Sequence, residues 1–158
     1  MFLLTLLPMD DLTDLYQQVI LDHCKNPRHF RELAGADRKA EGNNPLCGDH
    51  FTIFVKLEGD IMREVTFQGA GCCISKASGS MMADMLKGKT IEEARKHFAE
   101  FQKMVTTGKA DEEQMGKLYA FCGVHRFPMR VKCATLAWHA LLASFKGDAK
   151  VSTEEPGS

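Results

Sequence analysis

Apolar residues recur at helical spacing near the start of the chain and alternate with polar residues further on. The helical pattern at i, i+3, i+4, i+7 and i+8 is made by Leu12, Leu15, Tyr16, Val19 and Ile20. It predicts a helix over residues 10–26. Residues 51–57 and 61–67 alternate instead, with a turn signal at 58–60, and predict an antiparallel hairpin. A further strand is expected near 38–44, before the segment NNPLCGD.

The second half of the chain carries helical patterns. A helix is predicted over residues 73–87, where Ile74, Ser78, Met81 and Met85 share one face. Thr90 with Glu93 is a capping box that opens another helix. A surface loop is expected at 106–114, and the last helix is expected to begin near Pro128 and to end at Gly147. The order predicts an α+β domain in which a small three-stranded antiparallel sheet packs against about five helices.

The chain of 158 residues suits one domain, which we place at 10–147. Residues 1–9 are interpreted as a flexible tail or as a start codon placed too early, with Met9 as the true start. The polar segment 148–158 is expected to be disordered.

Charge and cysteine content narrow the class of function. The formal net charge is −1, which favours neither nucleic acid nor a membrane surface as a partner, and no apolar run is long enough to span a bilayer. Six cysteines are many for this length. Because no secretion signal is evident, we expect a cytoplasmic protein whose cysteines are metal ligands or nucleophiles rather than a disulfide framework.

Three cysteines fall at the ends of predicted elements. Cys47 lies in a turn with Asp49 two residues on, so the thiol and the carboxylate should share one face of the strand. Cys72 follows Gly69-Ala70-Gly71 at a strand-to-helix turn, and Cys133 lies early in the last helix. Three thiolates and a carboxylate could hold zinc or an iron–sulfur cluster. Arg130, close to Cys133, is a candidate for stabilising its thiolate or is simply an exposed charge.

Other residues have simpler interpretations. Cys122 and Cys24 continue apolar stripes and are expected to be at least partly buried. His23, His29, His50 and His139 could each be a ligand, but a lone histidine is more often solvated or hydrogen-bonded. The methionines at 81, 82 and 85 are expected to fill the core.

Four motifs together resemble the U-type iron–sulfur assembly proteins, the IscU and NifU N-terminal family. They are LYQQVILDHCKNPRH, NPLCGD, GAGCCISKASGSMM and FPMRVKCATLAWHAL, and the likeness covers about 10–147. The chain is most similar to the SufU branch, because the segment between Cys72 and Cys133 is long and because Lys132 stands where the IscU branch has a histidine ligand.

The resemblance implies a site and an activity. Cys47, Asp49, Cys72 and Cys133 would hold zinc, and Cys133 would accept persulfide sulfur from a PLP-dependent cysteine desulfurase of the SufS type. The protein would then pass the sulfur to downstream cluster-assembly proteins. It would be a sulfurtransferase-like partner of the desulfurase rather than a stand-alone enzyme.

Two alternatives remain open. The same four residues could assemble a [2Fe–2S] or [4Fe–4S] cluster, as in the IscU branch, or the chain could be a structural zinc module that binds a partner.

The resemblance also assigns Cys72 rather than Cys73 to the site, because family members usually carry a small residue at the position of Cys73. Cys24 departs from the usual tyrosine of the first motif.

Overall fold

The structure is a computed structural model that describes residues 9–147 and 149–153, with side chains described from Leu15 onward. The predictions made for residues 1–8, for the side chain of Leu12 and for 154–158 lie outside the described residues.

The elements follow the predicted order. The first half holds α2 (Met9–Lys25), β1 (Arg38–Asn44), β2 (Asp49–Glu58) and β3 (Ile61–Ala70). The second half holds α3 (Cys73–Leu86), α4 (Ile91–Thr107), α5 (Glu112–Met115), the 3-10 helix η1 (Gly116–Arg126), α6 (Pro128–Lys146) and β4 (Lys150–Ser152). The loop predicted at 106–114 is therefore shorter, because α4 continues to Thr107 and α5 begins at Glu112.

The sheet has four strands in the order β3-β2-β1-β4, so the prediction of three strands is wrong. β1, β2 and β3 pair antiparallel, whereas β4 runs parallel to β1 with Val151 opposite Gly42. A strand of three residues is too short to show an alternating pattern, and its polar surroundings hid it. β4 lies within the segment 148–158, for which the sequence predicts disorder.

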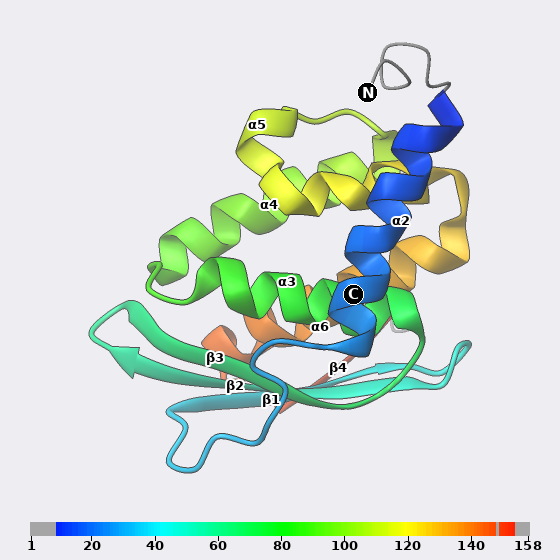
Figure 1. Cartoon of the computed structure of the whole chain (residues 1–158). Coiled ribbons are helices and arrows are strands. Elements are labelled where there is room, and N and C mark those ends of the chain that lie inside the picture. The colour runs from blue at the N-terminus through cyan, green and yellow to red at the C-terminus, as the bar shows by residue number, and fades with distance from the viewer. Residues whose placement is uncertain (1–8, 148, 154–158) are drawn as a thin grey trace.

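All the helices lie on one side of the sheet (Figure 1). α6 packs against β1 and β2, and α3 packs against β3, while α2, α4 and η1 contact these two helices. Phe51, Ile53 and Trp138 are fully buried between the layers. Trp138 also donates a hydrogen bond from Nε1 to Ser78 Oγ at 3.2 Å, so its one polar atom is satisfied in the core. The α+β class is confirmed.

Local signals in the sequence begin or end the helices as expected. Thr90 and Glu93 form both bonds of the capping box, and Gly147 ends α6 with a φ of 85°. The stripe of the first helix is less buried than predicted, because Leu15 is 50% exposed while Ile20 is buried. No helix among the described residues has the length and apolar character needed to cross a membrane.

Candidate metal centre

The pairing of the strands brings three chain segments to one end of the sheet. Asn44, the last residue of β1, is opposite Asp49, the first of β2, and His50 is opposite Ala70 at the end of β3. The turn between β1 and β2 and the turn that leads from β3 into α3 therefore lie beside one another. These are the two turns in which Cys47 and Cys72 were predicted to be ligands.

Cys47 sits in the turn that joins β1 to β2. The carbonyl oxygen of Asn44 accepts hydrogen bonds from the backbone N–H groups of Cys47 at 3.2 Å and Gly48 at 2.8 Å, which closes the turn. Gly48 has a φ of 74°, a left-handed conformation that glycine adopts at little cost. The turn leaves Cys47 exposed at the rim of the site.

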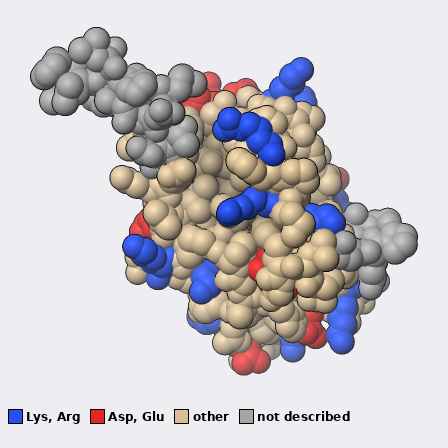
Figure 2. All heavy atoms as spheres, turned by 90° about the vertical axis from the view of Figure 1, so that its right-hand side faces the viewer, with Lys and Arg blue, Asp and Glu red and all other residues tan. Residues whose placement is uncertain are grey.

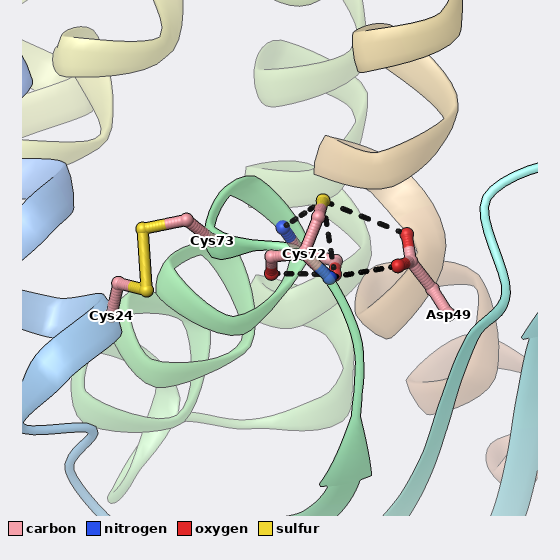
Figure 3. Close-up of a disulfide and its surroundings, with 5 residues drawn as sticks. Cys24, Asp49, Cys72 and Cys73 are labelled. Carbon is pink, nitrogen blue, oxygen red and sulfur yellow. Dashed lines mark hydrogen bonds between the residues drawn. A yellow bond between two sulfur atoms is a disulfide. The ribbon is translucent and has the colours of Figure 1, made fainter.

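Asp49 is fully buried and is tied to the start of α3 (Figure 3). Its Oδ1 accepts the backbone N–H of Cys72 at 2.8 Å, and its Oδ2 lies 3.8 Å from the Cys72 sulfur. Cys72 is the N-cap residue of α3, and its sulfur accepts the N–H of Ser75 at 3.5 Å. The carboxylate thus fixes both the backbone and the side chain of Cys72.

Cys133 approaches from α6 and is 3% exposed. Its thiol lies 3.6 Å from the Cys47 sulfur and receives a hydrogen bond from Asn44 Nδ2 at 3.7 Å. Asn44 is itself buried and accepts from Thr153 Oγ1 at 3.1 Å. Sequence patterns carry no signal for Asn44 or Thr153, because their hydrogen bonds join segments that are far apart in the chain.

The donor atoms of Cys47, Asp49 and Cys133 all lie within 4.8 Å of one another. Cys72 adjoins this group through Asp49 Oδ2 and through the Cys133 thiol. Zinc–sulfur bonds of about 2.3 Å place the ligand atoms of a tetrahedron about 3.8 Å apart. The separations of 3.6 Å and 3.8 Å match that edge. The ligand atoms of Cys47, Asp49 and Cys133 therefore suit a metal ion such as zinc, and Cys72 lies beside this group rather than within it.

The contact between Cys72 and Cys133 shifts the pKa values of their thiols in opposite directions. A hydrogen bond from the Cys133 thiol, with further bonds from Ser75, lowers the pKa of Cys72 to about 6, against the opposing effects of burial and of Asp49. The same contact, followed by burial and by Asp49, raises the pKa of Cys133 far above its usual value. The contact between the two thiols therefore favours the charged form of Cys72 and the neutral form of Cys133.

Other predicted residues lie away from this centre. Arg130 is exposed in the first turn of α6, and no interaction in the described parts of the chain joins its guanidinium to a site thiol. No histidine within 9–147 or 149–153 belongs to the ligand group. His50 points to Glu41 at 2.9 Å, and His139 packs edge-on against Phe98.

The surface at this end of the molecule is mostly neutral (Figure 2). Lysine and arginine side chains are scattered over it, and acidic side chains are few near its middle. Exposed apolar residues flank the ligands: Leu46, 58% exposed, precedes Cys47, and Phe127, 57% exposed, precedes α6.

Comparison with known proteins places this geometry in a family. Residues 15–134 match the NifU-like N terminal domain. The chain belongs to that family. A zinc-dependent sulfurtransferase SufU from Bacillus subtilis (strain 168) is 44% identical over 149 residues, which are 94% of this chain and 97% of the relative. An iron–sulfur cluster assembly scaffold protein IscU from Streptococcus pyogenes serotype M1 is 39% identical, over 89% of each chain.

Solved structures agree with this assignment to the NifU-like family. One, described as a candidate iron–sulfur cluster assembly scaffold protein for the SUF system from Fervidobacterium islandicum AW-1, has a TM-score of 0.76 and 34% identity. It covers 80% of this chain and 93% of its own. A second, a hypothetical protein, has a TM-score of 0.79 and 40% identity over 85% of this chain and 98% of its own. The resemblance inferred from the four sequence motifs is confirmed.

Gly71 lies against the centre of the site, so a side chain there should disturb it. A Cβ atom at Gly71 would lie 2.7 Å from Phe51 Cε2, 2.8 Å from Asp49 Oδ1 and 2.8 Å from Ser75 Oγ. We expect Gly71→Ala to lower the free energy of unfolding by about 1–3 kcal/mol, measured by urea denaturation. Gly123→Ala is the control, because its Cβ would meet the flexible end of Arg126 alone. Equal effects of the two substitutions would contradict this prediction.

Proposed function

We propose that this protein accepts persulfide sulfur on Cys133 from a PLP-dependent cysteine desulfurase of the SufS type and passes it to iron–sulfur cluster assembly. Cys47, Asp49, Cys72 and Cys133 would hold a zinc ion. In this proposal the protein works in the cytoplasm, where thiols stay reduced, and it is a sulfurtransferase-like partner of the desulfurase rather than a stand-alone enzyme.

One observation carries the proposal: three thiols and one carboxylate, drawn from three separate segments, converge at one end of the sheet. The Cys133 sulfur lies 3.6 Å from the Cys47 sulfur, and Asp49 Oδ2 lies 3.8 Å from the Cys72 sulfur. The 44% identity to a protein named as a zinc-dependent sulfurtransferase supports the same function. Lys132 and the absence of a histidine from the described ligand group favour it over cluster assembly.

The chemical step is an exchange between sulfur atoms. The Cys133 thiolate attacks the outer sulfur of the persulfide on the desulfurase, and a new sulfur–sulfur bond forms on Cys133. The bond between the outer and inner sulfur of the desulfurase breaks, and the inner sulfur leaves as a thiolate. No net oxidation occurs, because one sulfur–sulfur bond replaces another.

This step requires a deprotonated and accessible Cys133. Bound zinc would supply the first condition, since a thiol that coordinates zinc is a thiolate. The second requires movement, because Cys133 is 3% exposed. Its sulfur contacts Cys47 in the turn between β1 and β2, so docking of the desulfurase would have to open the site there. Arg130, on the exposed side of the first turn of α6, would then be free to approach the thiolate, which is the role proposed for it.

The exposed apolar residues Leu46, Phe127 and Met129 suit a docking surface for the desulfurase. They precede Cys47 and Cys133 closely in the sequence, so a partner that covered them would bring its own persulfide to the acceptor. Desolvated aromatic and methionine side chains commonly anchor such interfaces.

The zinc and sulfide content of the purified protein tests the proposal. We expect anaerobic purification without added metal to give about one zinc per chain and no acid-labile sulfide. Incubation with the desulfurase and cysteine should then add the mass of one sulfur atom to the peptide that contains Cys133.

The second candidate function is a scaffold for a [2Fe–2S] or [4Fe–4S] cluster on the same residues, which the 39% identity to an IscU scaffold protein favours. Iron with an equal amount of sulfide in the purified protein would support it and contradict the zinc-dependent transfer.

A further inference from the structure

Cys24 and Cys73 form a disulfide between α2 and α3 (Figure 3). Their Cα atoms are 5.2 Å apart, within the range that a disulfide requires. Both residues are half-buried. The proposed function uses neither of them, and the expectation that the cysteines form no disulfide is wrong for this pair.

The two cysteines stay close for reasons that do not involve the bond itself. Where α2 ends beside α3, Ser80 Oγ lies 2.8 Å from His23 Nδ1 and accepts the backbone N–H of Arg28 at 2.8 Å. His29 Nε2 lies 3.2 Å from Asp84 Oδ1 in the next turn. These contacts hold the helices together when the disulfide is broken. Two thiols fixed so near one another have a high effective concentration, so the bond can open and close without unfolding.

The disulfide does not involve Cys72, the proposed metal ligand next to Cys73. Successive residues of a helix point about 100° apart. Cys72 accordingly points to Asp49, while Cys73 points away from the metal centre to Cys24 (Figure 3). Oxidation of Cys73 therefore removes no ligand.

The position of the bond nevertheless couples it to the metal centre. Cys73 is the first residue of α3, and its neighbour Cys72 is the N-cap of the same helix. The loop that the disulfide closes, with a sequence separation of 49, contains Cys47 and Asp49 and ends beside Cys72. A closed loop restricts how far these residues can separate when the site opens.

We propose that Cys24 and Cys73 are a reversible dithiol–disulfide pair that reacts with small-molecule disulfides of the oxidised-glutathione class and, when closed, slows the release of zinc. One protein thiol attacks the small disulfide, forms a mixed disulfide and expels one small thiol. The second protein thiol displaces the other. Two protein thiols are oxidised, and one small disulfide is reduced to two thiols. The effect on zinc rests on the proposed function, whereas the disulfide does not.

Differential alkylation of the full-length protein tests the pair. The zinc-loaded protein is equilibrated with glutathione buffers of graded redox ratio, alkylated under denaturing conditions with a chelator, reduced, and alkylated again with a second label. We expect the second label on Cys24 and Cys73 together in oxidising buffer and on neither in reducing buffer. The other four cysteines should carry the first label throughout. Cys24→Ser and Cys73→Ser should each abolish the second label, and Cys122→Ser should not change it.

The rate at which zinc passes to a coloured chelator tests the coupling. We expect several-fold slower release from the oxidised protein than from the reduced protein, and Cys24→Ser should release zinc at the faster rate in both buffers. A disulfide that joins Cys73 to Cys72, or equal release rates in the two states, would overturn the proposal. If the protein held no zinc, the proposed function would fail, while the alkylation pattern would still decide whether the pair exists.

Discussion

Replacement of Cys133 by serine is expected to abolish sulfur acceptance. The serine hydroxyl cannot form the persulfide, so the yield of transferred sulfur should fall by at least about 10³-fold. The variant should still fold, because the side chain keeps its shape and its oxygen can accept the Asn44 Nδ2–H that now bonds the sulfur at 3.7 Å. The measurement is the added mass of one sulfur atom after incubation with desulfurase and cysteine, in an excess of zinc.

Two further variants make this result specific. Cys122→Ser is the matched control, because its thiol donates to the carbonyl oxygen of Gly108 and a hydroxyl can do the same. It should accept sulfur as the wild type does. Cys72→Ser should weaken zinc binding but leave the acceptor in place, so added zinc should restore part of its transfer. A persulfide on Cys133→Ser that disappears in Cys72→Ser would assign the acceptor to Cys72 instead.

Two substitutions of Asp49 are expected to distinguish its role as a metal ligand from its role as the acceptor of the Cys72 N–H. Asp49→Asn keeps a carbonyl oxygen that can accept the Cys72 N–H, now bonded at 2.8 Å, but it loses the charge that binds a metal. Zinc affinity should fall by at least about 100-fold, since even the loss of a supporting residue costs 10–100-fold. The metal-free variant should be at least as stable as the metal-free wild type, because a buried carboxylate is costly without a partner cation.

Asp49→Ala should lose both functions. It leaves the Cys72 N–H without its acceptor in a partly buried place, which costs about 1–3 kcal/mol. In a chain of this size the melting temperature should fall by about 2–10 °C. Zinc titration with a competing chelator measures the first effect, and thermal unfolding of the metal-free proteins measures the second. Zinc binding by Asp49→Asn at wild-type strength would exclude Asp49 as a ligand.

The parts of the fold that depend on local patterns could be predicted. Helical periodicity, the Thr90–Glu93 capping box and the alternation in β2 and β3 each place an element that the structure contains. β4 could not be predicted, because three residues carry no period and their partner, β1, lies far away in the sequence. The strand exists through tertiary pairing, which local propensity does not record.

The candidate site, too, could be predicted only in part. Cys47, Cys72 and Cys133 could be singled out because they fall at the ends of predicted elements, and the family motifs supported the same residues. Strand alternation does not account for Cys47 and Asp49, because Cys47 lies in the turn before β2 and Gly48 has a φ of 74°. The hydrogen bonds from Asn44 to Cys133 and from Thr153 to Asn44 had no signal in the sequence, because each joins segments that are far apart in the chain. Nor did the contact between Cys24 and Cys73, because the helix spacing that suggests burial for each does not say which face meets which.

The link between Thr153 and Asn44 also sets an order of events during synthesis. Thr153 follows Asn44 by 109 residues, and a ribosome adds residues at about 5–20 per second. At least about five seconds therefore pass between the synthesis of Asn44 and the synthesis of Thr153, whose hydroxyl bonds the Asn44 side chain. Cys47 and Cys72 emerge well before Cys133, so the growing chain exposes two thiols with no third to complete the cluster. The cysteines of the site should accordingly be most open to oxidation in the interval before Cys133 has been added.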